Sequence, residues 1–186
     1  MTARPLFDRP AFILAIFILG SLDAAAQEGI EMRHLARQGA VALGANPLTA
    51  AARTAFYTAR GFPAVAIRPY SEACGFSFGF RNGGATQVAV KLADWRAVGA
   101  DGRQVAFRPP EAWDIDWEKA GLPQAARIAF RWAQFQSENL FEPGDWIMGM
   151  ATLTARPVPP FRLVARYHDT KGDHEIVIDQ LECARD

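Results

Sequence analysis

Large apolar residues alternate with small or polar ones along most of the chain after residue 63. Between 74 and 80, one parity carries Cys74, Phe76, Phe78 and Phe80, while alternate positions hold glycine and serine. An alternation with period two predicts a β-strand whose large side chains face a core. The same pattern recurs in short segments separated by turn residues, which predicts about eight strands. The expected strands cover residues 64–67, 74–80, 88–92, 105–107, 128–132, 147–153, 161–167 and 175–183.

Short strands joined by turns are typical of an antiparallel sandwich or barrel. The predicted fold class is therefore mainly β, an antiparallel immunoglobulin-like sandwich of about seven or eight strands. Pro109, Pro110 and Pro123 interrupt the alternation. Residues 109–125 are expected to form a long irregular connection with a single helical turn near 116–119.

The segment 147–153, together with Trp146 before it, is apolar on both faces, which predicts a strand in the middle of the fold. One face carries Trp146, Met148 and Met150, and the other carries Ile147, Gly149, Ala151 and Leu153. The methionines are interpreted as core residues, because methionine is a common core filler. Residues 142–146 precede the strand, and Pro143-Gly144 predicts a type II turn there.

The residues before 63 suggest helix instead. Asn46 is a good N-cap, Pro47 suits the first helical position, and Gly61 follows the end. Apolar residues between them recur at helical spacing, which predicts an amphipathic helix of about 13 residues packed on the sandwich. A weaker helix is possible over 28–37. These signals divide the chain into a helical segment (27–62) and a β-sandwich domain (63–186) within one globular unit (27–186).

The first 26 residues have the order of a secretory signal peptide. Arg4 and Arg9 lie before an apolar run over 11–19, and Ala24-Ala25-Ala26 forms the cleavage region. The run of about 9 residues is too short to span a bilayer, which needs roughly 20. Cleavage after Ala26 would leave an exported, soluble protein, periplasmic or extracellular, with no transmembrane segment; an uncleaved membrane anchor is the alternative.

The balanced charge of the chain narrows the choice of partners. The chain has 20 basic and 20 acidic residues, so no electrostatic feature predicts nucleic acid or an anionic membrane as a partner.

Cys74 and Cys183 are predicted to form a disulfide, because lone cysteine pairs usually bond in oxidising compartments. A reactive thiol or a metal pair is the alternative. A β-bulge at Asp179-Gln180 would turn Cys183 inward with Ile178.

Two motifs resemble catalytic or metal-binding sequences but fail on context. Gly75-Phe76-Ser77-Phe78-Gly79 matches a nucleophile elbow, yet the strand alternation passes through Ser77 with no helix after it. Asp114-Ile115-Asp116 resembles the start of a calcium loop, but Lys119 and Ala125 occupy its glycine and glutamate positions. Solvated acids on a helical turn explain the second motif better.

The candidate binding residues lie in two loops. Exposed indoles beside acids suit peptides, glycans or protein surfaces; alternatively, the two indoles of the first loop fold back as a lid over the core. The second loop contributes only if it lies at the same end of the fold as the first. The candidates are Trp113, Asp114, Trp117, Glu142, Asp145 and Trp146.

The predicted function is an exported, non-catalytic binding or accessory protein that contacts another exported protein, a peptide or a glycan, with no cofactor. One alternative is a periplasmic copper carrier with Met148, Met150, His168 and His174 as ligands, since thioethers and imidazoles suit Cu(I). A second alternative is a carboxylate-dependent hydrolase or lyase. It would require two carboxyl groups to converge in a cleft. Asp114, Asp116, Glu142 and Asp145 are the acids that could do so.

Overall fold

The computed structural model describes residues 32–185, and the predicted signal peptide lies outside this range. Within it the chain forms ten strands, four α-helices and one 3-10 helix. The strands are β1 (His34–Gln38), β2 (Val41–Leu48), β3 (Gly75–Asn82), β4 (Val88–Lys91), β5 (Arg96–Val98), β6 (Gln104–Arg108), β7 (Glu138–Phe141), β8 (Trp146–Leu153), β9 (Phe161–Asp169) and β10 (Gly172–Leu181). The helices are α1 (Ala50–Thr58), α2 (Ala64–Glu72), η1 (Leu92–Asp94), α3 (Pro110–Lys119) and α4 (Gln124–Ala133).

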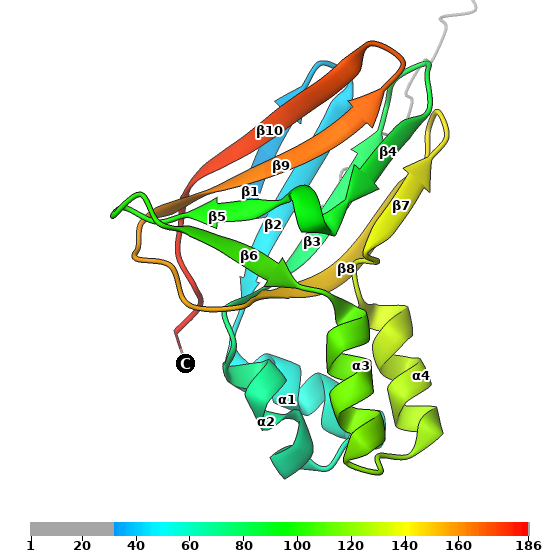
Figure 1. Cartoon of the computed structure of the whole chain (residues 1–186), viewed down its shortest axis with the longest axis vertical. Coiled ribbons are helices and arrows are strands. Elements are labelled where there is room, and N and C mark those ends of the chain that lie inside the picture. The colour runs from blue at the N-terminus through cyan, green and yellow to red at the C-terminus, as the bar shows by residue number, and fades with distance from the viewer. Residues whose placement is uncertain (1–31, 186) are drawn as a thin grey trace, which may run out of the picture.

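The ten strands make one antiparallel sheet that doubles over into two layers (Figure 1). One layer has the order β1-β2-β3-β8-β6, and the other contains β5, β9, β10, β4 and β7. β6 joins the layers, because it pairs with β8 at Phe107 and with β5 at Gln104. Phe78, Phe80 and Trp95 are fully buried in the core between the layers. The predicted mainly β, antiparallel class is confirmed.

The four α-helices gather at one end of the sheet (Figure 1) and enclose a second, aromatic core. α1 and α2 connect β2 to β3, and α3 and α4 connect β6 to β7. The Tyr70 ring meets Tyr57 and Phe130 edge to face, with centroids 5.3 and 5.2 Å apart. Within residues 32–185, none of the helices has the length and apolar character needed to cross a membrane.

Two segments predicted as strands are helices. Residues 64–67 begin α2, and residues 128–132 lie in α4. Ala126 and Phe130, four residues apart, are buried against the aromatic core, whereas Trp132 is exposed. Over so short a window, large residues at every second position fit a strand or a helix. Helical spacing prevails here because it directs Ala126 and Phe130 to one face.

The predicted irregular connection is also wrong, because residues 110–119 form all of α3. Pro110 stands at its first position, where proline is tolerated because that N–H has no partner within the helix. The helix predicted after Asn46 exists but begins at Ala50, and Thr49 caps it by accepting a hydrogen bond from the Ala52 N–H (3.1 Å). Asn46 itself lies in β2. In the described part of 28–37, the possible helix is replaced by β1.

β8 occupies the predicted central position, paired with β3 on one side and with β6 at its end. Gly149, Ala151 and Leu153 are buried, but Met148 is 51% exposed, so its assignment to the core is wrong. Met150 is half-buried against the helical core. The turn before β8 agrees with type II, since Gly144 has φ +91° and the Asp145 N–H donates to the Glu142 carbonyl (3.0 Å).

The C-terminal end of the fold is fastened as predicted. Cys74 and Cys183 form a disulfide with a Cα–Cα distance of 5.2 Å. The pairing of β10 with β9 shifts register between Ile178 and Leu181, and Gln180 has φ +57°. This bulge lets both Ile178 and Leu181 enter the core.

Candidate functional site

The indoles of Trp113 and Trp117 lie in the helical core rather than on the surface. They are 6% and 5% exposed and stack with centroids 5.8 Å apart. The Trp113 Nε1–H donates to Thr152 Oγ1 (3.0 Å), and the Trp117 Nε1–H donates to the Ala66 carbonyl (3.2 Å). With their polar atoms satisfied internally, the two indoles fold inward, which is the lid arrangement considered from the sequence.

Asp114 is committed to ion pairs that join α3 to α4. Its Oδ1 accepts from Arg127 Nε (2.7 Å), and its Oδ2 accepts from Arg127 Nη2 and Arg131 Nη1 (3.1 Å each). The hydrogen bonds from Arg127, more than the accompanying charges, hold the pKa of Asp114 below its ordinary value. With both oxygens occupied, Asp114 clamps the helix pair.

Glu142, Asp145 and Trp146 lie at the opposite end of the sheet from the helices, where β7 turns into β8 (Figure 1). Glu142 Oε1 accepts from Gln87 Nε2 (2.5 Å), and Asp145 Oδ2 accepts from the Glu142 N–H (2.9 Å). The structure therefore does not bring the two candidate loops together. Asp114 and Asp145 stand at opposite ends of the molecule and do not converge in a cleft.

The four candidate copper ligands are dispersed. Met148 is on the outer face of β8, and Met150 accepts a contact from the Tyr57 hydroxyl at its sulfur (3.6 Å). His168 and His174 belong to the β9–β10 hairpin, where each bonds its own aspartate at 2.9 and 2.8 Å. No group of three or more histidine, cysteine or acidic side chains in residues 32–185 is arranged to hold a metal. The copper alternative stays a prediction that the geometry does not favour.

Ser77 lies within regular β3, paired with Asn46 on one side and Met150 on the other. It has the extended backbone of a strand, and a nucleophile elbow requires a sharp strand-to-helix turn. Tyr57 and Tyr70 are buried titratable groups of the helical core, and both are hydrogen-bonded to Gln134. Burial raises the pKa of Tyr70 to about 12. A phenol with such a pKa stays neutral at physiological pH and offers no base.

A different surface is formed by the outer face of β1, β2, β3 and β8. Strand pairing places three parallel rows of side chains there. The first row is Arg37, Ala42, Arg81 and Trp146; the second is Leu35, Gly44, Gly79 and Met148; the third contains Asn46, Ser77 and Met150. The first two rows are called the arginine face below.

The arginine face combines exposed apolar side chains with unpaired cations. Leu35, Trp146 and Met148 are 51%, 58% and 51% exposed. No acidic residue stands in the rows, and neither Arg37 nor Arg81 forms an ion pair with any residue of the range 32–185. Their Cα atoms are two strand spacings apart, about 10 Å. The surface therefore carries two positive charges beside an aromatic ring.

Two glycines lower the middle of the arginine face. Gly44 and Gly79 are adjacent across β2 and β3, between Leu35 and Met148. A Cβ at Gly44 would lie 2.2 Å from Met32 Cγ, so the Met32 side chain rests directly on the glycine. The space left by the missing side chain of Gly44 is thus filled by Met32 of the same chain.

Sequence reasoning found Trp146 but missed Leu35, Arg37 and Arg81 as its neighbours. The alternation around Ser77 does place small residues on one face of β3. Recognising the arginine face also requires the pairing of β1 with β2 and of β2 with β3, and neither β1 nor β2 was predicted. The signal available in the sequence was the run of small residues in both β2 and β3, which permits close approach on one side of a sheet.

Comparisons of the chain with protein-family models, with curated proteins and with solved structures give no match. The function is therefore inferred from the sequence and the described structure.

Proposed function

We propose that this protein is an exported, non-catalytic binding module that holds an acidic segment of a partner protein on the arginine face. The observation that carries this proposal is the exposed Trp146 beside Arg81, which forms no ion pair within residues 32–185, on neighbouring strands of the sheet. The immunoglobulin-like character of the fold remains part of the proposal, and the binding mode does not depend on it.

Charge selects the chemistry of the partner. Arg37 and Arg81 present two guanidinium groups with no competing acid in their rows. Guanidinium groups bind carboxylates with paired hydrogen bonds, and arginine is enriched at protein interfaces for this reason. An acidic segment of the partner satisfies both cations, whereas a basic segment is repelled.

Apolar exposure favours a protein partner over a glycan. Trp146 and Met148 expose more than half of their area on one strand, and clustered apolar exposure marks interaction sites. Aromatic residues, methionine and arginine are the types enriched in the buried centres of interfaces.

Ser77 and Asn46 are the polar neighbours in the third row, and Asn46 Oδ1 accepts a hydrogen bond from the Arg33 backbone N–H. Export accounts for the disulfide, because disulfides persist in oxidising compartments. The signal-peptide prediction is the reason for placing the partner outside the cytoplasm.

The test uses two matched synthetic peptides, one of glutamate, leucine and phenylalanine, and one in which lysine replaces each glutamate. We expect the acidic peptide to bind and to quench or shift the Trp146 fluorescence, assigned by comparison with Trp146→Phe. Arg81→Glu should weaken binding about tenfold or more, which corresponds to about 1.4 kcal/mol of binding free energy. Added salt should also weaken binding.

Arg68→Glu on the exposed side of α2 is the matched control, because it changes the net charge equally at a distance from the arginine face. The proposal fails if the acidic and basic peptides bind alike. It also fails if Arg81→Glu and Arg68→Glu reduce binding to the same extent, since long-range charge alone would then explain the effect.

A further inference from the structure

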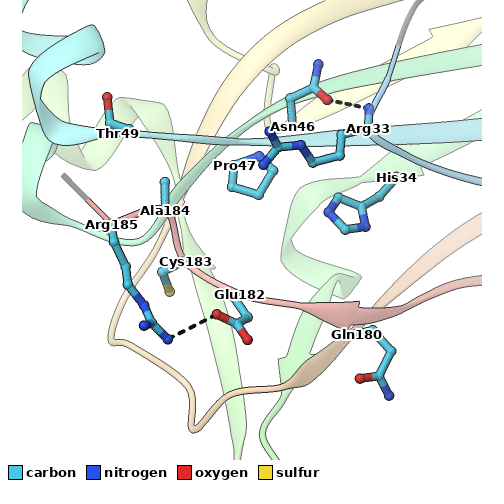
Figure 2. A pocket seen from close by; sticks show the side chains of 10 residues that line it. All are labelled: Arg33, His34, Asn46, Pro47, Thr49, Gln180, Glu182, Cys183, Ala184 and Arg185. Carbon is cyan, nitrogen blue, oxygen red and sulfur yellow. Dashed lines mark hydrogen bonds and ion pairs between the residues drawn. The ribbon is translucent and has the colours of Figure 1, made fainter.

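A groove of about 1010 Å³ separates the start of the β1–β2 hairpin from the C-terminal segment (Figure 2). Arg33, His34 and Asn46 line one wall, and Gln180, Glu182 and Arg185 line the other. Its size is at the upper end of the range of small-molecule sites. The lining is polar, with amides, an imidazole and charged groups, and it contains no tryptophan, tyrosine or phenylalanine.

The charges of the groove leave one cation uncompensated. Glu182 Oε2 and Arg185 Nη2 are 3.2 Å apart and neutralise each other. The Arg33 guanidinium has no carboxylate within ion-pair distance in residues 32–185. The backbone of Arg33 is held in place, because its backbone N–H donates to Asn46 Oδ1 (2.6 Å). A guanidinium with no ion pair is suited to bind a carboxylate through two hydrogen bonds.

His34 stands beside Arg33 in the same wall (Figure 2). Burial, and then the neighbouring Arg33 charge, lower the pKa of His34. The imidazole is therefore neutral at physiological pH and can either donate or accept a hydrogen bond. It adds a polar contact without adding charge.

Gln180 faces the groove from a strained position. It is the non-glycine residue with positive φ (+57°) in the described chain, and it lies in the β10 bulge. Left-handed backbone costs a non-glycine residue about 1–2 kcal/mol, and such strain concentrates at functional sites. The bulge directs Leu181 to the core and Gln180 to the groove, as bulges commonly reorient side chains.

The disulfide sets the distance between the two walls. Cys183 lines the groove itself, and its bond to Cys74 fastens residues 182–185 to the start of β3. The groove is therefore preformed rather than assembled by the ligand. Preformed polar sites lose less free energy to ordering when they bind.

We propose that this groove binds a small polar ligand through a carboxylate group, with Arg33 as the carboxylate contact and His34 and Gln180 as hydrogen-bonding contacts. The site is separate from the arginine face and does not depend on the function proposed for it. A sugar acid and a peptide C-terminus both supply this chemistry.

The test is a titration followed by backbone amide NMR with two matched pairs of probes. The first pair is galacturonate and galactose; the second is N-acetyl-dialanine and its C-terminal amide. We expect at least one carboxylate probe, and neither uncharged probe, to shift the resonances of Arg33, His34 and Gln180 at up to about 10 mM ligand. The responding pair distinguishes a sugar acid from a peptide terminus.

Variants separate a ligand contact from a structural role. Arg33→Gln should weaken binding about tenfold or more, whereas Arg68→Gln should not change it. Gln180→Gly should weaken binding while raising the thermal midpoint, because glycine relieves the positive φ. The proposal is overturned if neither carboxylate shifts these resonances, if the uncharged probes bind equally, or if Arg33→Gln binds like the unaltered protein.

Discussion

At the scale of single residues, the polar groups of the helical layer hold the structure together and are not free for chemistry. Asp114 illustrates this, because it is 9% exposed and receives three hydrogen bonds from Arg127 and Arg131. A carboxylate so placed is costly to neutralise, since the guanidinium groups then lose their partner. Its sequence context, an acid between two tryptophans, resembled a binding loop.

Asp114→Asn should lower the free energy of unfolding by about 2–4 kcal/mol, measured by urea denaturation with tryptophan fluorescence. Asp116→Asn is the control; Asp116 pairs with Arg108 but its side chain is 55% exposed, so about 1 kcal/mol or less should be lost. Equal losses in the two variants would contradict the assignment of Asp114 as a clamp.

The same residue predicts an acid dependence. Because hydrogen bonds from Arg127 lower the folded-state pKa of Asp114, its contribution to stability is present above the unfolded pKa and is lost as pH falls through the folded value. From its ordinary pKa of 3.8 downward, the unaltered protein should therefore lose stability more steeply than Asp114→Asn. Parallel pH profiles for the two proteins would exclude this role.

At the scale of elements, strands with large core residues could be predicted and elements built from small residues could not. β3 and β9 were recognised because phenylalanine, leucine and tyrosine recur at every second position. β2 was missed because Gly44 and the alanines on either side of it, Ala42 and Ala45, give this segment no clear pattern of large residues. Gly44 is small because Met32 covers it, and that contact comes from tertiary packing. The arginine face was hidden for the same reason.

Gly149 shows how one element depends on another. A Cβ at this position would lie 2.3 Å from the Phe135 backbone nitrogen, where the chain leaving α4 crosses β8. The Phe135 N–H donates to the Met150 carbonyl there (2.9 Å). Glycine is required because backbone approaches backbone.

Gly149→Ala should therefore cost about 2–4 kcal/mol of stability, measured by thermal and urea unfolding. Ser77→Ala, on the outer face of the adjacent strand, should change stability by about 0.5 kcal/mol or less. If Gly149→Ala were as mild as Ser77→Ala, the crossing would have to be more open than the structure indicates.

At the scale of the whole molecule, the disulfide connects the end of the chain to its first buried phenylalanine-rich strand. Cys74 and Cys183 are separated by 109 residues, so the bond encloses β3 to β10 and both helices of the second pair. The two layers of the sheet and the α3–α4 pair thus belong to one covalent loop. Its main thermodynamic effect is on the unfolded chain, whose freedom it restricts.

Replacing both cysteines (Cys74→Ala with Cys183→Ala) should lower the free energy of unfolding by about 4–5 kcal/mol, the loop-closure value for a separation of this length. The denaturant m-value should rise at the same time, because the unfolded chain without the cross-link exposes more surface. Reducing agent should destabilise the unaltered protein by a similar amount and leave the double variant unchanged.

If the double variant lost stability with an unchanged m-value, the disulfide would instead act on the native state, by holding the C-terminal wall of the groove in place. Since that wall carries Arg185 and Gln180 and is held by the disulfide, we also expect reduced carboxylate affinity in the folded double variant.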